Sequence, residues 1–391
     1  MPGAVSRSLI GRMSKPTDIT IKEARCAAER IEYRTPIKFG GRVVTDVVLL
    51  NVTVDVETRD GRRGTGFGSM PMGNVWAWPS NVVSAEQTLA TMVDLGQQLV
   101  KLAEDCSESG HPLELAHALA RDHVTVAEES VRRLSVDEAM PRLAQLVCAS
   151  PIDAAIHDAY GKALGVNSYN LLGEEFTNSD LSAYLGQEFT GEYLDRYTSR
   201  APQDRMPLYH LVGALDPLFD EDIDQRIDDG LPETLGEWIL ADGLTHLKIK
   251  LNGEDLAWDV NRVARVEKAS AIAQAARGCS EWNYSLDFNE KCENVDYILG
   301  FLAKLNEASP AALDRVQYIE QPTHRDLRAH PENKMHEAAK IKPVVIDESL
   351  TDLETLLLAR EQGYSGVALK TCKGHSEALL MGAAAQKYSM F

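Results

Sequence analysis

The chain has 391 residues, 44% of them hydrophobic and 25% charged, a composition typical of a globular protein long enough for two domains. Its formal net charge of −19 argues against nucleic acid as a partner, because phosphate binding needs a basic surface. The six cysteines form no CxxC pair, which argues against a zinc site or a disulfide framework and favours reduced thiols in the cytoplasm. No apolar run reaches the roughly 18 residues of a membrane helix, so we expect no membrane partner.

In chain order, residues 1–17 lack the long apolar core of a signal peptide and are predicted to be a flexible tail. Residues 18–35 and 43–57 alternate apolar and polar positions like strands, Asp60-Gly61 indicates a hairpin turn, and a third strand follows near Thr65–Gly68. The glycine-rich "GTGFG" of that strand is not followed by a helix, which argues against a phosphate-binding loop.

From Ser84 to Gly165 the pattern is helical. Ser84 is a candidate N-cap, and a second helix, "SPIDAAIHDAYGKALGV", is expected to start near Pro151 and to end at Gly165. We therefore predict an α+β capping domain over residues 18–200, with the domain junction in the polar stretch 174–205.

Residues 201–391 alternate short apolar runs with helical segments, beginning with a strand at Leu208–Val212. Five later runs each end in a charged residue, in the order Lys, Asp, Glu, Asp, Lys: "THLKIKL" with Lys248 and Lys250, "YSLDFN" with Asp287, "VQYIEQP" with Glu320, "PVVIDES" with Asp347, and "GVALKT" with Lys370. The gaps from Lys250 onward are 37, 33, 27 and 23 residues. This spacing is typical of a (β/α) barrel, in which the strand ends converge on one face.

The pattern contains six strand-helix units, whereas a closed barrel of this type needs eight. We therefore expect an α/β fold with a modified TIM barrel that is incomplete at the C-terminus, its last two strands not present in this chain. A genuinely shortened, altered barrel is the alternative.

Residues two apart in a strand share a face, so Lys248 and Lys250 are predicted to point the same way. Two adjacent ammonium groups and a nearby divalent cation disfavour protonation, which is how a lysine becomes a base near neutral pH. A solvated pair at the end of an amphipathic strand is the alternative.

Asp287, Glu320 and Asp347 are hard oxygen donors that suit Mg²⁺ or Mn²⁺ better than zinc. Each acid alone is more often a helix N-cap, but three on successive strand ends favour a metal site. Such a site stabilises the enediolate charge that develops when a proton is removed next to a carboxylate. Two bases on opposite faces of the substrate permit racemisation, and one base with a cation permits cycloisomerisation or elimination.

These residues resemble the enolase superfamily, specifically the muconate lactonizing enzyme subgroup of the mandelate racemase/muconate lactonizing enzyme family. The resemblance also covers the N-terminal hairpin unit and the "PIDAAIHDAYGKALGVNSYNLLG" segment. It implies Mg²⁺ at the three acids, Lys250 and Lys370 as the acid/base pair, and Lys248 beside the substrate carboxylate. It also implies that Asn289 and Glu348 support the metal ligands. The "KTCKGHS" segment departs from the family by lacking a double glycine after Lys370.

The family also closes its site with loops of the first domain, here Thr35–Gly41 and Gly68–Pro79. The candidates for covering the substrate are Lys38, Phe39, Trp76 and Trp78, and packing of these loop aromatics on a neighbouring domain or subunit is the alternative. His210, His324 and His375 lie near strand ends or in adjoining loops, where they either touch substrate or are surface residues.

We thus expect a cytoplasmic, homo-oligomeric, Mg²⁺-dependent racemase, epimerase or cycloisomerase acting on a small carboxylate. An acid-sugar dehydratase on the same scaffold and a non-catalytic, degenerate metal-binding protein are the alternatives.

Overall fold

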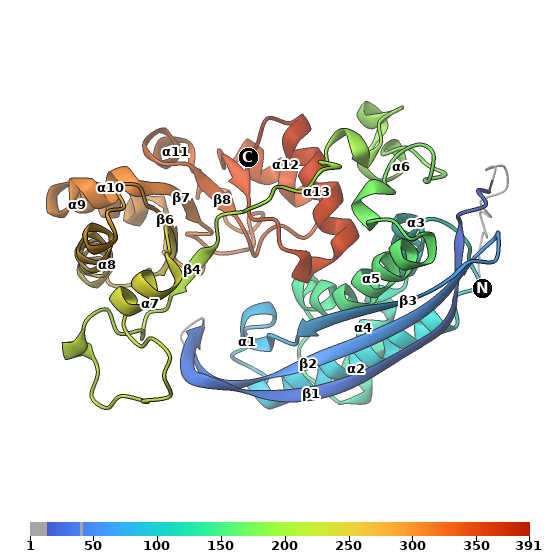
Figure 1. The fold of residues 1–391 in the computed structure, drawn as a ribbon, viewed down its shortest axis with the longest axis horizontal. Helices are drawn as coiled ribbons and strands as arrows, with labels where there is room; N and C mark the ends of the chain where they lie inside the picture. The colour runs from blue at the N-terminus through green and yellow to red at the C-terminus, as the bar shows by residue number, and fades with distance from the viewer. Residues whose placement is uncertain (1–13, 40–41) are drawn as a thin grey trace. The chain divides into compact units, whose positions relative to one another are not determined.

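The computed structural model describes residues 14–39 and 42–391, and within them the chain forms two compact units (Figure 1). The first contains the chain up to Ile31, Val47–Pro202 and Lys370–Ala384. The second contains Glu32–Asp46, Gln203–Leu369 and Ala385–Phe391. The domain boundary predicted between residues 200 and 201 stays a prediction.

The N-terminal sheet has the strand order β1 (Ile19–Phe39), β2 (Arg42–Thr58) and β3 (Arg63–Pro71). β2 and β3 are antiparallel, with Val54 opposite Gly66. The hairpin turn predicted at Asp60-Gly61 is confirmed, and Gly61 has the positive φ of 90° that such a turn requires. Along β2 the side chains alternate between buried and partly exposed positions, so one face of this sheet belongs to the core.

The helices that follow β3 and precede the second sheet are α1 (Asn74–Ala77), α2 (Ala85–Glu104), α3 (Pro112–Ala120), α4 (His123–Arg133), α5 (Arg142–Leu164), η1 (Ser168–Asn170), α6 (Ser182–Leu185), η2 (Gln187–Phe189) and η3 (Leu194–Arg196). Ser84 caps α2, as predicted, in a capping box with Gln87. α5 ends, as predicted, at Gly165, whose φ is 68°.

The prediction that a helix starts near Pro151 is wrong, because α5 begins at Arg142 and Pro151 lies in its interior. Proline has no N–H to donate to the carbonyl four residues earlier, that of Val147. The hydroxyl of Ser150 donates to this carbonyl instead, over 2.9 Å. A neighbouring side chain thus satisfies the acceptor that the proline leaves open.

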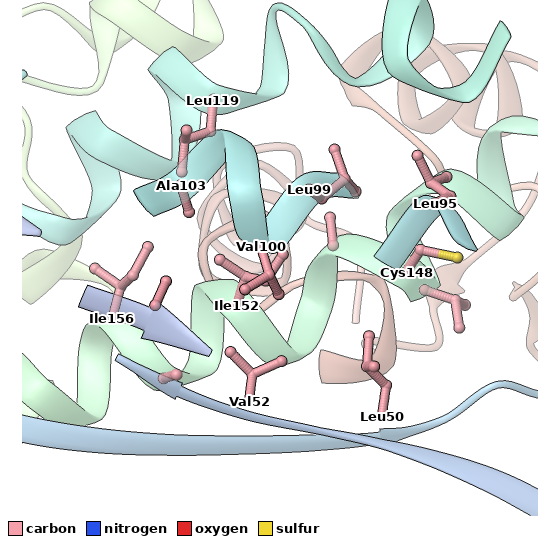
Figure 2. Packing of buried hydrophobic residues seen from close by; sticks show 14 of the residues in the cluster. Leu50, Val52, Leu95, Leu99, Val100, Ala103, Leu119, Cys148, Ile152 and Ile156 are labelled. Atoms are coloured by element: carbon pink, nitrogen blue, oxygen red, sulfur yellow. The ribbon is translucent and has the colours of Figure 1, made fainter. Parts of the chain in front are cut away.

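The core of the first unit lies between α2, α5 and the sheet, where Leu50 and Val52 of β2 face Leu95, Leu99 and Ile152 (Figure 2). The glycines of "GTGFG" belong to this contact. A Cβ on Gly64, Gly66 or Gly68 would lie within 2.0–2.3 Å of a backbone oxygen of α5. β3 therefore approaches α5 more closely than any side chain would allow, which gives the glycines a structural role.

The second sheet has six strands in the order β4 (Tyr209–Val212), β5 (His246–Lys250), β6 (Asn283–Asp287), β7 (Val316–Glu320), β8 (Val344–Ile346) and β9 (Gly366–Val367). Every neighbouring pair is parallel. The helices and 3₁₀ turns that follow β4 in the chain are η4 (Asp220–Asp222), α7 (Leu235–Asp242), α8 (Leu256–Arg277), α9 (Val295–Ala308), α10 (Pro310–Arg315), α11 (His336–Ile341), α12 (Leu353–Glu361), η5 (Thr371–Lys373) and α13 (His375–Lys387), and η5 and most of α13 belong to the first unit.

This alternation of parallel strands and helices is the modified TIM barrel architecture that we predicted. Within residues 14–39 and 42–391 it has six strands, the predicted number. Leu247, Ile249, Leu286 and Ile319 are fully buried, as expected for strands covered on both faces. Phe391 adds backbone hydrogen bonds beside β9. Its N–H donates to the carbonyl of Ser365, and its carbonyl accepts from the N–H of Val367. Among the described helices, none is both long and apolar enough to cross a bilayer.

Candidate functional site

The charged residues at the ends of β5, β6 and β7 lie side by side in the second sheet. Lys250 is the register partner of Asp287, and Asp287 is the partner of Glu320. Glu320 pairs with Val345, and Asp347 lies two residues beyond Val345, directly after the end of β8. Because the strands are parallel, the carboxyl ends that carry these residues share one edge of the sheet. The structure thus brings together four of the charged strand ends found in the sequence.

The two lysines of β5 bridge the carboxylates. Lys250 Nζ lies 2.6 Å from Asp287 Oδ2, and Lys248 Nζ lies 2.9 Å from the same atom. Lys248 Nζ also donates to both carboxylate oxygens of Glu320, each over 2.6 Å. The shared contact at Asp287 shows that Lys248 and Lys250 point the same way, as the strand periodicity predicted.

The three carboxylates are withdrawn from solvent. Asp287 and Asp347 are 1% exposed and Glu320 is 2% exposed, while Lys250 is 7% exposed. Ionised side chains are this deeply buried only where opposite charge compensates the loss of hydration. The site is therefore an internal ion network, and the alternative of a solvated lysine pair is excluded for Lys250.

Asn289 supports this network from a strained backbone position. Its φ is 47°, and its N–H donates to Asp287 Oδ1 over 2.8 Å. Its side-chain oxygen accepts from Lys250 Nζ over 3.1 Å. Asn289 therefore orients both the carboxylate and the ammonium group, and asparagine is among the residues that tolerate this backbone conformation.

Gln321 was missed in the sequence, although it directly follows Glu320 in "IEQP". Its φ is 32°, and its fully buried side chain crosses to the next strand end, where Oε1 accepts from the N–H groups of Asp347 and Ser349 over 2.9 and 3.2 Å. Gln321 thus fixes the end of β8 relative to the end of β7. A buried glutamine after a strand has no local pattern that marks it.

Arg325 and Glu290 were also missed, and they form a second ion pair beside the acids. Arg325 Nε lies 2.8 Å from Glu290 Oε2. Burial opposes the charge of Arg325, but the Glu290 carboxylate outweighs it, so the pKa of Arg325 lies above its usual value; Glu348 and Asp347 act in the same direction. Glu348 is only 2% exposed, so it also contributes buried negative charge.

The network is rich in carboxylates. Five of them, on Asp287, Glu290, Glu320, Asp347 and Glu348, lie among the cationic side chains of Lys248, Lys250 and Arg325. Across the described ranges, no group of three His, Cys, Asp or Glu side chains is arranged to hold a metal ion as it stands. The lysine contacts explain this, because ammonium groups lie against Asp287 and Glu320. The donor set itself, three buried carboxylates on adjacent strand ends, fits Mg²⁺ or Mn²⁺.

A cavity of about 290 Å³ adjoins Lys250 in the second unit. It is lined by Lys38, Ala214, Leu215, Lys250, Leu251, Asn252, Glu254, Trp258, Asn289 and Lys291. Three lysines against one glutamate give its wall a positive charge, which suits a carboxylate ligand. Lys38, a candidate for covering the substrate, thus lines the same cavity as the candidate base Lys250.

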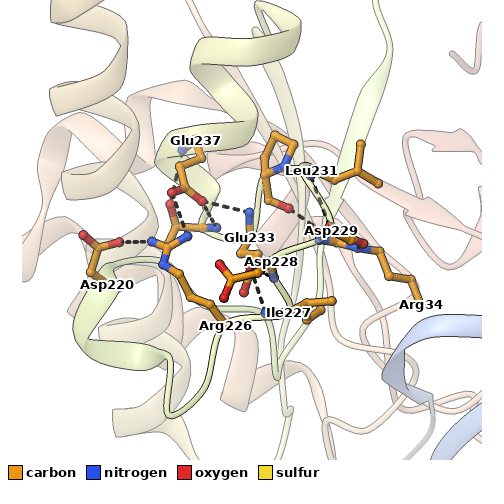
Figure 3. Close-up of polar contacts among 11 residues, drawn as sticks. Arg34, Asp220, Arg226, Ile227, Asp228, Asp229, Leu231, Glu233 and Glu237 are labelled. Atoms are coloured by element: carbon orange, nitrogen blue, oxygen red, sulfur yellow. Dashed lines mark hydrogen bonds and ion pairs between the residues drawn. The ribbon is translucent and has the colours of Figure 1, made fainter.

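Lys38 lies in β1, so the prediction of a loop at Thr35–Gly41 is wrong over residues 35–39, which form the end of a strand. This end of β1 is tied to an acidic segment after β4 (Figure 3). Arg34 makes a two-pronged ion pair with Asp229, with Nε and Nη2 at 2.6 and 2.7 Å from the two carboxylate oxygens. Within that segment Arg226 joins Asp220 and Glu237 over 2.7 and 3.0 Å. These contacts anchor the start of the predicted lid Thr35–Gly41. The side chain of Phe39, another candidate, lies outside the described part of the structure.

Lys370 and the two candidate tryptophans belong to the first unit. Lys370 follows β9 by three residues, and its Nζ lies 5.3 Å from the centre of the Trp76 ring. Trp78 is 1% exposed, and its indole N–H donates to Glu138 over 2.8 Å. These contacts make Trp78 a core residue, whereas Trp76 is only half-buried and touches a predicted catalytic residue.

The three histidines near strand ends have other neighbours. His210 packs against Trp238 with ring centres 5.5 Å apart, and burial lowers the pKa of His210. His324 packs against His330, and His375 against His157. Within residues 14–39 and 42–391, none of these ring contacts joins a histidine to the ion network.

Comparison with known proteins was made for sequence and for fold. No family model matches the chain. Muconate cycloisomerase 1 of Rhodococcus opacus is 25% identical over 366 residues, which cover 91% of this chain and 74% of that protein.

Solved structures of similar fold cover 95% of this chain. The L-Ala-D/L-Glu epimerase of Bacillus subtilis, in a substrate complex, has a TM-score of 0.60 at 17% identity, with 80% of its chain covered. The dipeptide epimerase of Enterococcus faecalis V583, complexed with Mg and L-Leu-L-Tyr, has a TM-score of 0.57 at 16% identity, with 80% covered. The muconate lactonizing enzyme of Pseudomonas fluorescens, complexed with muconolactone, has a TM-score of 0.55 at 18% identity, with 78% covered.

Proposed function

Because the chain is a homologue of a muconate cycloisomerase and has the fold of the mandelate racemase/muconate lactonizing enzyme family of the enolase superfamily, we propose that it is a Mg²⁺-dependent isomerase of small carboxylates. Its reaction would remove a proton next to the substrate carboxylate and return it on the other face or elsewhere. Racemisation, epimerisation and cycloisomerisation all follow this scheme.

The buried ion network is the observation that carries the proposal. Asp287, Glu320 and Asp347 are the residues that would hold the ion, because they are buried carboxylates at adjacent strand ends and carboxylate oxygens are ligands that Mg²⁺ prefers. When bound, the ion supplies positive charge that stabilises the negative charge developing on the substrate carboxylate. Similar folds bind Mg together with a dipeptide, which agrees with this assignment.

The lysines carry the proton transfers in this proposal. Lys250 is held at a defined place by Asp287 and Asn289 and lines the cavity, so it is assigned as one acid/base group. Lys248 lies against Glu320, and its assigned role is to bind the substrate carboxylate. Lys370 is assigned as the acid/base group for the opposite face. A positioned base of this kind accelerates proton transfer by about 10²–10⁴-fold.

The cavity and its cover support a small anionic substrate. Its volume of about 290 Å³ and its three lysines suit a molecule of dipeptide or aromatic-acid size. Lys38 reaches this cavity from the lid, and Trp76 contacts Lys370, so these two residues remain the candidates for excluding water.

Proton exchange in D₂O tests the proposal. The protein is incubated with Mg²⁺ and a panel chosen from the ligands of similar folds: L-Ala-L-Glu, L-Leu-L-Tyr, mandelate and muconolactone. We expect deuterium at the α-carbon of at least one compound, detected by NMR, and loss of exchange from one face in Lys250→Ala and from the other in Lys370→Ala. The matched control is Lys304→Ala, an exposed lysine on α9.

Three outcomes would change the assignment. Exchange that survives both substitutions would contradict the two-lysine mechanism, and no exchange with any member of the panel would favour a non-catalytic scaffold. Loss of water from an added acid sugar would move the reaction class to dehydration.

A further inference from the structure

The turn that follows Lys370 is held by a buried carboxylate from α5, distant in sequence. Asp153 Oδ2 accepts the backbone N–H of Ser376, and Asp153 Oδ1 accepts its hydroxyl, both over 2.7 Å. Asp153 is 9% exposed and Ser376 is 6% exposed. Ser376 is the second residue of α13, so the carboxylate binds the N-terminal end of a 13-residue helix, where backbone N–H groups favour negative charge.

Two aromatic contacts fix the same point from other sides. His157 Nε2 lies 2.9 Å from the hydroxyl oxygen of Ser376. The rings of His157 and His375 have their centres 4.5 Å apart, and Tyr169 meets His375 edge to face at 5.2 Å. The start of α13 is therefore clamped against α5 and cannot move without breaking several buried contacts.

The residues between this clamp and Lys370 form a compact turn. The N–H of Lys373 donates to the carbonyl of Lys370 over 3.0 Å, and that of Gly374 donates to Thr371 over 2.9 Å. Gly374 has a φ of 117°, and a Cβ there would lie 3.3 Å from Asp153 Oδ2. A displacement at Ser376 would pass along this turn to Lys370, because few of its torsions are free.

The side chain of Lys370 is held at its other end. Its ammonium group lies over the Trp76 ring, at 5.3 Å from the ring centre, in a cation–π contact. Trp76 belongs to α1, which packs beside α2 and α5 in the first unit. Asp153, Trp76 and Lys370 are thus parts of one rigid packing arrangement within that unit.

We propose that Asp153 is a positioning residue that sets the place of Lys370 through the turn Thr371–Ser376. This inference rests on the proposed function, in which Lys370 moves the proton on one face of the substrate. Asp153, His157 and Ser376 are not among the residues to which the proposed function assigns metal binding, substrate binding or proton transfer. Their effect on catalysis would therefore pass through Lys370 alone, so it would act on one face and spare the other.

The test is the Asp153→Asn variant, in which an NH₂ group replaces one of the two acceptor oxygens of the carboxylate and its negative charge is lost. Exchange is measured separately for the two faces of the substrate found with the panel above, and the Lys370 face is defined as the one lost in Lys370→Ala. We expect exchange from that face to fall by about 10- to 100-fold, as for a misplacement of around 1 Å, with the other face changed less than about twofold. Asp105→Asn, an exposed aspartate after α2, is the matched control.

A second readout needs no substrate. Limited acetylation with acetic anhydride, read by peptide mass spectrometry, compares the labelling of Lys370 with that of Lys304 in each variant. We expect the relative labelling of Lys370 to change in Asp153→Asn and in the milder Ser376→Ala, and to stay constant in Asp105→Asn. Ser376→Ala keeps the test open if Asp153→Asn fails to fold.

The outcomes separate the two proposals. Equal loss of exchange from both faces, or unchanged Lys370 labelling in both variants, would overturn the positioning role and leave the proposed function intact. Absence of exchange in the unmodified protein would overturn the proposed function, and the labelling result would then decide the positioning of Lys370 by itself.

Discussion

Replacing Lys248 by methionine tests whether the Lys248 ammonium group stabilises the buried carboxylates of Glu320 and Asp287. Lys248 Nζ makes three contacts of 2.6–2.9 Å with Glu320 and Asp287, and both acids are almost fully buried. Methionine keeps most of the volume but removes the charge, so Glu320 remains buried without that cation. Loss of one partner from a buried ion pair costs about 3–5 kcal/mol. We expect the Lys248→Met variant to lose free energy of unfolding in that range when metal is removed with EDTA.

Added Mg²⁺ should reverse much of this loss. In the unmodified protein the ion competes with the Lys248 ammonium group for Glu320, whereas in the variant it does not. A ligand present at 100 times its Kd stabilises the folded state by about 2.7 kcal/mol, and the competition makes this gain larger in Lys248→Met than in the unmodified chain. The substitution should therefore lower the free energy of unfolding without metal and increase the gain in this free energy when Mg²⁺ is added.

Urea denaturation followed by circular dichroism, in EDTA and in excess Mg²⁺, measures both quantities. Lys304→Met serves as the control, because Lys304 is exposed on α9 and its loss should change the free energy of unfolding by less than about 0.5 kcal/mol. Two results would refute the reasoning: a Lys248→Met variant as stable as the control in EDTA, or an unfolding midpoint that Mg²⁺ does not raise in either protein.

Further predictions concern the first unit. Gly66→Ala should lower the free energy of unfolding in urea by at least about 1–3 kcal/mol, because its Cβ would lie 2.0 Å from the carbonyl oxygen of Ala155. Gly73→Ala is the control and should be nearly neutral, since its Cβ would have no atom within 4 Å. Similar losses for both variants would contradict the close contact of β3 and α5. Burial lowers the pKa of His111 to about 4, below its unfolded value of 6.5. The stability that His111 contributes is therefore complete above pH 6.5, and as the pH falls toward 4 the free energy of unfolding decreases by about 3 kcal/mol. His111→Asn, which keeps an N-cap acceptor for α3, should flatten the acid limb of stability against pH, and an unchanged limb would show that His111 does not titrate in unfolding.

Local periodicity and strand order made part of the fold and of the site predictable from the sequence. Lys250, Asp287, Glu320 and Asp347 could be placed together because parallel strands end at one edge of a sheet, whatever the details of their side chains. The hairpin at Gly61 and the N-cap at Ser84 were predictable for the same reason, since the residues that form them are neighbours in the chain.

The residues that bridge these elements could be identified from the folded chain alone. The lysine contacts at Asp287, the reach of Gln321 to Asp347, and the hold of Asp153 on Ser376 join residues 26 to 223 positions apart. Such contacts leave no periodic pattern, because each depends on two backbones meeting at a particular distance and angle. The same cause made Pro151 a helix-interior residue and Trp78 a core residue, since burial and the satisfaction of hydrogen bonds are properties of the packed chain.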